Sequence, residues 1–258
     1  MNMFKSNYFV ILALLFLLAV FTSSCATTPV SQEKSEYIEK AGHYEDMEDY
    51  EESARWYRKA ADQGDADGQA GLGYMYYKGL GVEQDDNEAL KWFNKAADQG
   101  NARAQNNLGG MYYYGHGVKQ DNSEALKWFH KAAEQGYGAT QNNLGVMYEN
   151  GQGVEQDYGE AVKWYRAAAE QGNPDAQYHL GGMYALGRGV EQDVNKMFMW
   201  YHKAAEQGHP VSQYNIGIMC ENGHGVEQNS TEAVKWFGKA AAQGFEEAEN
   251  TLKRMEVE

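Results

Sequence analysis

The sequence has few cysteines, few prolines and too few basic residues to balance its acidic ones. Its two cysteines, Cys25 and Cys220, can form at most one disulfide bond. Two of the three prolines, Pro174 and Pro210, stand where helices are expected to begin, a position at which the missing amide proton costs nothing. Lys and Arg number 22 against 37 Asp and Glu, so the formal net charge is −15. Such a surface repels phosphate backbones, and we expect no nucleic-acid partner.

What the sequence does contain is a repeat marked by all six of its tryptophans. Each Trp is followed by an aromatic residue, two spacers, two small residues, one further residue and then Gln-Gly, and successive copies are 36 residues apart. Self-similarity at a fixed period of roughly 20 to 50 residues is typical of stacked repeats, so we predict one solenoid domain. The tryptophans are Trp56, Trp92, Trp128, Trp164, Trp200 and Trp236.

Each copy reads as a helix, a seven-residue loop and a second helix. In the copy at residues 137–172, Leu144, Met147 and Tyr148 fall at spacings of three and four, which gives the first helix one apolar stripe. Trp164 and Tyr165 belong to a similar stripe on the second helix. Two such stripes have to be buried against each other and against the next hairpin, so the repeat predicts an all-α fold.

Polar residues and glycines at fixed positions support the helical interpretation. Four copies carry a capping residue before the second helix and a Glu three positions later, which predicts a capping box. These pairs are Asp85 and Glu88, Asp121 and Glu124, Asp157 and Glu160, and Asn229 and Glu232; Asp193 faces Lys196 instead. Glycines inside the first helices cost about 1 kcal/mol each relative to Ala, and they predict close approach of a neighbouring helix. They are Gly109, Gly145, Gly181 and Gly217.

The recurring motifs resemble those of the Sel1-like repeat family. Leu-Gly-Xaa-Met-Tyr, Gly-Xaa-Gly-Val-Xaa-Gln-Asp, Glu-Ala-Leu-Lys-Trp-Phe and Lys-Ala-Ala-Xaa-Gln-Gly recur in register over residues 65–244. The resemblance implies a right-handed α/α superhelical solenoid of helix-turn-helix repeats, similar to tetratricopeptide solenoids. It also implies a role as an adaptor or scaffold. A Cys-rich subgroup of that family has a disulfide in each repeat and is linked to β-lactam binding, but here Cys220 stands alone where most other copies have Tyr.

These patterns divide the chain into three parts. We expect a signal peptide at residues 1–24, a lipidated flexible tether at 25–35 and the solenoid at 36–258. The solenoid is expected to contain a degenerate N-terminal repeat at 36–64, five full repeats at 65–100, 101–136, 137–172, 173–208 and 209–244, and a C-terminal capping helix at 245–256.

The N-terminal segment predicts a lipid anchor. The apolar run over residues 8–21 is too short to span a bilayer as a helix, and it suits the core of a signal peptide. The sequence Ser23-Ser24-Cys25 then resembles a bacterial lipobox, although Thr22 stands where Leu is usual. The resemblance implies lipidation of Cys25 and, because Ala26 follows, transfer to the periplasmic face of the outer membrane. Ordinary secretory cleavage is the alternative.

No residue set in the sequence points to catalysis, a cofactor or a metal. The repeated Gly-Xaa-Gly lacks the Lys and third Gly of a phosphate loop, so we interpret it as loop geometry. Histidines at equivalent positions, such as His116 and His224, are separated by whole repeats and do not make a compact metal site. No Ser-His-Asp or Cys-His arrangement stands out, and we expect no enzyme activity.

Residues that vary between copies predict where a partner binds. They lie off the apolar stripe of the first helix and should face the concave surface of the solenoid. Tyr contributes contact area with few rotors and Asn offers both donors and acceptors, and we expect affinity to concentrate in the Tyr pair. Drift on an unconstrained face is the alternative explanation. The predicted partner-binding residues are Tyr74, Asn106, Asn107, Asn142, Asn143, Tyr178, His179, Tyr214 and Asn215.

The sequence therefore favours a periplasmic scaffold, anchored to the membrane by lipid, that binds a protein or peptide without catalysis. Tyr and Asn also suit sugars, so an envelope factor that binds peptidoglycan or assists polysaccharide export is the alternative. A hydrolase of cell-wall or β-lactam compounds is a third class of function.

Overall fold

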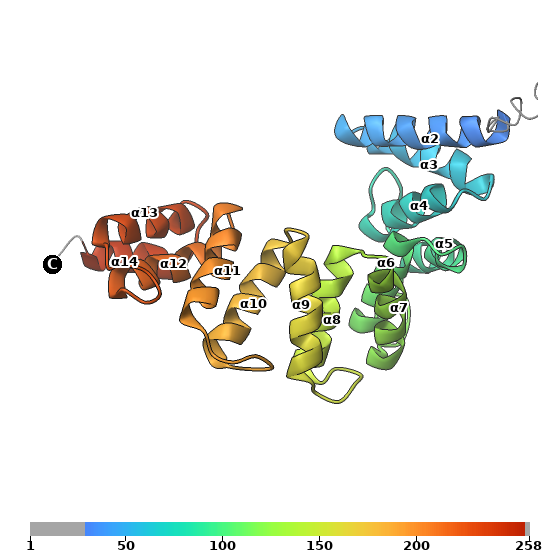
Figure 1. Ribbon diagram of the computed structural model, residues 1–258. Helices are drawn as coiled ribbons and strands as arrows, with labels where there is room; N and C mark the ends of the chain where they lie inside the picture. Colours follow the sequence, from blue (N-terminus) through green and yellow to red (C-terminus); the bar gives the residue numbers. More distant parts are fainter. Residues whose placement is uncertain (1–28, 256–258) are drawn as a thin grey trace, which may run out of the picture.

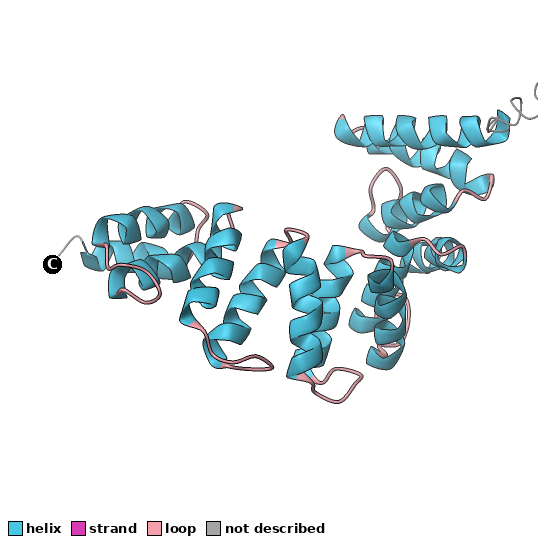
Figure 2. Ribbon diagram, viewed as in Figure 1, coloured by secondary structure: helices cyan, strands magenta, loops and turns pink. Residues whose placement is uncertain are grey.

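The computed structural model describes residues 29–255, and this part of the chain consists of helices and connecting loops without strands (Figures 1 and 2). The helices follow one another along an open curved array, with α2 at one end and α14 at the other (Figure 1). The predicted all-α solenoid is confirmed. None of the described helices is long and apolar enough to cross a membrane. The helices are α2 (Pro29–Asp46), α3 (Tyr50–Asp62), α4 (Ala66–Lys78), α5 (Asp86–Asp98), α6 (Ala102–Tyr114), α7 (Asn122–Glu134), α8 (Gly138–Asn150), α9 (Tyr158–Glu170), α10 (Pro174–Leu186), α11 (Val194–Glu206), α12 (Pro210–Asn222), α13 (Ser230–Ala241) and α14 (Glu246–Met255).

Five helical hairpins make up the body of the array. We call α4, α6, α8, α10 and α12 the first helices, and α5, α7, α9, α11 and α13 the second helices. Each helix packs against the helix before it and the helix after it in the chain, and α4 also contacts α2 and α6, its counterparts in the adjacent repeats. First helices therefore approach one another more closely than second helices do in this part of the array, which places them on the inner side of the curve.

The predicted close approach at the first-helix glycines is confirmed. In the α6–α7 hairpin, Leu108 and Met111 are buried, and a Cβ added at Gly109 would lie 2.4 Å from the ring of Phe129. The ring therefore rests directly on the α6 backbone, and a side chain at Gly109 would push the two helices apart. The other three predicted glycines face the ring of the following second helix in the same way; these pairs are Gly145 and Tyr165, Gly181 and Tyr201, and Gly217 and Phe237.

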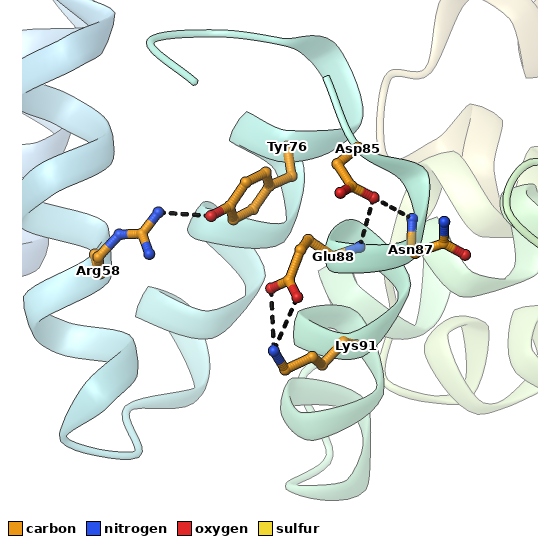
Figure 3. Close-up of polar contacts among 6 residues, drawn as sticks. All are labelled: Arg58, Tyr76, Asp85, Asn87, Glu88 and Lys91. Atoms are coloured by element: carbon orange, nitrogen blue, oxygen red, sulfur yellow. Dashed lines mark hydrogen bonds and ion pairs between the residues drawn. The ribbon is translucent and has the colours of Figure 1, made fainter. Parts of the chain in front are cut away.

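The N-caps of the second helices are confirmed, but the capping box is wrong. The Asp85 carboxylate accepts hydrogen bonds from the backbone amides of Asn87 and Glu88, at 2.9 and 3.0 Å (Figure 3). The backbone amide of Asp85 does not bond to the Glu88 side chain, as a capping box requires, but donates to the carbonyl of Tyr76 in α4. The Glu88 carboxylate pairs instead with Lys91 at 2.9 Å (Figure 3).

The loop explains this difference, because it returns the capping residue to the end of the first helix, where carbonyl groups are free. The same amide-to-carbonyl bond is made by Asp121, Asp157, Asp193 and Asn229. The Glu of the expected box is left to pair with a Lys one turn later, as in Glu124 with Lys127, Glu160 with Lys163 and Glu232 with Lys235.

A ladder of buried glutamines joins neighbouring repeats, and the sequence analysis missed it. The Gln105 side chain in α6 accepts a hydrogen bond from Nε2 of Gln135, just after α7, at 2.8 Å. Its own Nε2 donates to the carbonyl of Ala97 in α5 at 3.3 Å. One buried amide is thus satisfied on both sides and links its repeat to the preceding one. The arrangement recurs at Gln69, Gln141, Gln177 and Gln213.

The interpretation of Gly-Xaa-Gly as loop geometry is confirmed. Gly153 has a φ of 75°, and a Cβ there would lie 2.5 Å from the carbonyl oxygen of Asn122 at the start of α7. The loop after α8 therefore packs on the second helix of the preceding repeat. Only glycine satisfies both the positive φ and the close backbone contact.

The N-terminal boundary of the solenoid differs from the prediction. Helix α2 begins at Pro29, so residues 29–35, predicted to belong to a flexible tether, are helical. Pro suits the first turn of a helix, and neither glycine nor another proline follows before Gly42. The predicted signal peptide and Cys25 lie outside the described residues.

Candidate binding groove

The first helices α4, α6 and α8 form a pocket of about 350 Å³ on the face that they share. Most of the lining comes from α6 and α8, and Phe129 reaches it from α7. We call this cavity the open pocket. It is lined by Tyr77, Asn106, Asn107, Gly110, Tyr113, Tyr114, Phe129, Asn143, Val146 and Met147.

The local sequence explains why the pocket stays open. Gly110 has no side chain, and a Cβ added there would meet no atom within 4 Å. The Phe129 ring and the Met147 side chain are buried and supply the apolar part of the lining. Asn106 and Asn107 are partly buried and line the pocket from α6.

The asparagine side chains of the open pocket differ in whether they form hydrogen bonds within the protein. The Asn106 Oδ1 accepts a hydrogen bond from the Thr140 hydroxyl at 2.7 Å, so this carbonyl is engaged. In the part of the chain that the structure describes, the side chains of Asn107 and Asn143 form no hydrogen bond within the protein. Their donors and acceptors are available to a ligand.

Aromatic side chains make up one rim of the pocket. The Tyr114 side chain is 66% exposed, lies edge-on to Tyr113 with ring centroids 4.8 Å apart, and stacks on His116 at 5.7 Å. The Tyr77 hydroxyl is 2.9 Å from the His116 Nδ1, and the Tyr113 hydroxyl donates to Oε1 of Gln152 at 3.0 Å. These contacts fix the rings around the opening.

The open pocket is electrically neutral although the chain carries a formal charge of −15. None of its lining residues is an Asp, Glu, Lys or Arg. Burial, and secondarily the carboxylate of Asp86, raises the pKa of the Tyr77 phenol, so this hydroxyl stays protonated at neutral pH. The lining therefore offers amides, phenols and apolar surface, but no paired acid and base. Within residues 29–255, no group of three His, Cys, Asp or Glu side chains is placed to hold a metal ion.

In the next repeat the corresponding surface is filled by rings, which we call the aromatic cluster. Tyr178 of α10 stacks on Tyr201 and on His209, with ring centroids 5.7 and 5.0 Å apart, and it contacts His179 at 5.4 Å. His179 in turn lies flat against Tyr165 at 4.8 Å. Burial raises the pKa of Tyr201 to about 12 and lowers the pKa of His179, so these groups are neutral in the folded chain at neutral pH.

His209 connects the aromatic cluster to the start of α12. Its Nδ1 accepts a hydrogen bond from the backbone amide of Ser212 at 3.1 Å, which makes the ring the N-cap of that helix. Its Nε2 lies 3.5 Å from the Asp175 carboxylate. Burial lowers the pKa of His209, and Asp175 opposes this effect. An Nδ1 that accepts a hydrogen bond carries no proton, so the cap requires the neutral ring.

The structure separates the predicted partner-binding residues into three groups. Asn106, Asn107 and Asn143 line the open pocket. The Tyr178, His179 and Tyr214 rings pack within the protein, the last against Phe237 and Phe245 at 5.5 and 5.3 Å. The remaining predicted residues, Tyr74, Asn142 and Asn215, are partly buried and lie outside the pocket lining, and the Oδ1 of Asn142 is buried without a hydrogen-bond partner within the described residues.

The sequence analysis missed the tyrosines of the rim. Tyr77, Tyr113 and Tyr114 follow the recurring Met-Tyr at the end of the first helix. The next copies have Glu149-Asn150, Ala185-Leu186 and Glu221-Asn222 at the positions of Tyr113 and Tyr114. A second set of variable positions, one turn beyond the one considered, was therefore the available signal.

Comparisons with known proteins bear on this architecture. A model of the Sel1 repeat matches residues 42–65, 66–101, 102–137, 139–173, 174–209 and 210–245. The crystal structure of a Sel1 repeat protein from Oxalobacter formigenes is similar to this chain, with a TM-score of 0.76 and 33% identity over 84% of this chain and 86% of that one. A search of curated proteins found no match.

A second solved structure is similar over part of its length. It is that of a protective antigen present in uropathogenic Escherichia coli strains, with a TM-score of 0.72 and 38% identity over 80% of this chain and 44% of that one. The chain thus spans less than half the length of the antigen. A third solved structure, from Klebsiella pneumoniae, has a TM-score of 0.52 and 23% identity over 79% of this chain and 99% of that one, and it shows the fold alone.

Proposed function

The chain belongs to the Sel1 repeat family, and on this premise we propose that it is a scaffold or adaptor that binds another protein through the face of its first helices. One observation carries the proposal: the open pocket presents the unpaired amides of Asn107 and Asn143 beside apolar and phenolic surface. Interfaces of moderate affinity favour this mixture, because rigid rings supply contact area and amides adapt to donors or acceptors. The pocket lining supplies no nucleophile paired with a base, and the proposed function is not catalytic.

The proposal includes a location in the cell envelope. Cys25, preceded by Ser23 and Ser24, is the proposed site of lipidation, and the lipid would hold the solenoid at the periplasmic face of the outer membrane. Each buried methylene contributes about 0.8 kcal/mol, and more than one acyl chain is needed for stable attachment. Replacing Cys25 with Ala should abolish metabolic labelling by palmitate and release the chain from membranes. Unchanged labelling would exclude this anchor.

Partner capture by groove variants tests the binding surface. The full chain is used to capture proteins from an envelope extract, and a wild-type chain is compared with the double variant Asn107→Ala, Asn143→Ala. We expect the variant to lose a captured protein, by roughly tenfold or more in affinity, because truncated interface anchors typically cost about 2 kcal/mol.

The matched control lies on the second helices. Lys163 and Lys235 pair with Glu160 and Glu232 at the surface, and their side chains are exposed. The double variant Lys163→Glu, Lys235→Glu should keep the captured protein. If the Lys variant loses it and the Asn variant retains it, the partner binds the outer face and the proposal is wrong.

A further inference from the structure

The lining of the open pocket indicates what kind of group binds there, an inference that rests on the proposed function. We propose that it receives one uncharged aromatic side chain from an extended segment of the protein partner, while the amides of Asn107 and Asn143 bind the main chain beside that side chain. The inference depends on the charge, the size and the polar groups of the lining.

The absence of charged side chains from the lining favours a neutral group in the pocket. A charged side chain inserted there would lose water and find no opposite charge among the lining residues. A neighbouring cavity, which Tyr77 also lines, contains the charged side chains of Lys78 and Asp86. Charged residues of the partner would therefore lie outside the open pocket, beside its rim.

Size and lining favour an aromatic ring. A volume of about 350 Å³ is near the lower end of the range for ligand pockets, roughly 300 to 1,000 Å³, and suits one large side chain rather than a folded segment. The rings of Phe129, Tyr77 and Tyr113 line the space, and aromatic pairs are most favourable in offset or edge-to-face contact. The Met147 side chain adds a thioether, which also packs well against rings.

The polar groups favour a peptide over a sugar. The unpaired amides of Asn107 and Asn143 each present a donor and an acceptor, as a peptide main chain does. A sugar ring carries hydroxyl groups around its edge, and those directed toward Phe129, Val146 and Met147 would be buried without partners. An aromatic side chain buries no such groups.

Two glycines at equivalent positions give a matched test. Gly110 lines the open pocket and has free space around it, so Gly110→Leu should fill the cavity without a clash. Gly182 is its counterpart beside the aromatic cluster, where an added Cβ would meet only the Tyr201 hydroxyl oxygen, at 3.7 Å. Both substitutions remove a glycine from a helix interior, so neither should lower the melting temperature.

The probe is a random peptide display library selected on the full wild-type chain. We expect the selected peptides to share one Phe, Tyr or Trp at a fixed position and to bind Gly110→Leu roughly tenfold more weakly or worse, with less than about a twofold change for Gly182→Leu. Replacing the shared aromatic residue with Asp should abolish binding.

Other outcomes separate the inference from the function on which it rests. Selected peptides without a shared aromatic residue, or peptides that bind Gly110→Leu normally but lose binding to the Asn107→Ala, Asn143→Ala variant, would overturn the inference and leave the scaffold function intact. An oligosaccharide probe that binds the chain and is blocked by Gly110→Leu, with no peptide selected, would overturn both.

Discussion

The face of the first helices has two halves, which we call the open half (α6 and α8) and the filled half (α10 and α12). Both are built on the same repeat, but the first contains the open pocket and the second contains the aromatic cluster. At one first-helix position α6 and α8 carry Asn106 and Asn142, whereas α10 and α12 carry Tyr178 and Tyr214. In the first half Asn106 lines the open pocket together with Gly110. In the second half Tyr178 packs on Tyr201 of α11, and Tyr214 packs on Phe237 of α13.

The halves also differ at other first-helix positions, since Asn143 in the first half aligns with His179 in the second. Side chains at variable first-helix positions, and not the frame of the repeat, therefore distinguish the open surface from the filled one. The buried frame does not change between the halves, because the glutamine ladder and the ring-on-glycine contacts recur in both. Repeats contact only their neighbours, so a change in one pair of repeats leaves the others in place. Binding and stability can therefore be divided between different repeats of one chain.

The largest expected effect comes from removing the rings of the filled half. The double variant Tyr178→Ala, Tyr214→Ala should lower the free energy of unfolding by about 2 to 5 kcal/mol, because both rings pack against core rings and their loss leaves cavities. The control variant Asn107→Ala, Asn143→Ala should change it by less than about 0.5 kcal/mol. Urea unfolding measures both, and hydrogen exchange should show loosening confined to α10–α13. Equal losses in the two variants would contradict the division between halves.

The frame of the repeat was predictable from sequence because it depends on spacing alone. The Trp period, the glycines beneath rings such as Phe129 and the Asp85 cap all follow from positions that recur in every copy. Where a side chain at a variable position packs depends on which residues of the adjacent repeat lie next to it. Tyr178 and Asn106 occupy the same position, yet Tyr178 stacks on His209 of the next repeat while Asn106 borders a cavity. Sequence reasoning therefore named three of the residues that line the pocket, but it did not predict that the Tyr178 and Tyr214 rings pack within the protein.

The second-largest effect is expected from removing the hydroxyl group of Tyr165, which lies at the border between the halves. The hydroxyl of the fully buried Tyr165 donates to the Glu149 carboxylate at 2.7 Å. Tyr165→Phe should lower stability by about 1.5 kcal/mol, the lower end for a hydrogen bond to a charged group. Tyr113→Phe is the comparison in the open half, where the hydroxyl bonds to the neutral amide of Gln152, and it should cost about 1 kcal/mol or less. Chemical denaturation of both variants checks the order, and a larger loss for Tyr113→Phe would reverse it.

The acid sensitivity of the filled half follows from its histidines. Burial lowers the pKa of both His179 and His209 below the ordinary value of 6.5. The unfolded chain therefore binds more protons than the folded chain as the pH falls below about 6.5, and the stability decreases with falling pH until the folded-state pKa is passed. The groups that face His209 are Asp175, Tyr178 and His179, and only the Asp175 carboxylate opposes the shift. The open half has no histidine that serves as an N-cap in the described chain, so its stability should not fall in the same way.

The smallest expected effect is the removal of one of these two titrating groups. Asn101 and Asn173 cap α6 and α10 at the position that His209 occupies before α12, so His209→Asn should preserve the cap with a side chain that does not titrate. We expect this variant to lose less stability than the wild type between pH 7 and pH 5, with the remaining loss due to His179. Because Asp175 already limits the shift at His209, the gain should be modest and confined to α10–α13 in hydrogen exchange at the two pH values. His116→Asn, at the exposed rim of the open pocket, serves as the control and should leave the pH dependence of α10–α13 unchanged. If His209→Asn loses as much stability on acidification as the wild type, while the His116 variant is protected, the acid-sensitive element lies in the open half instead.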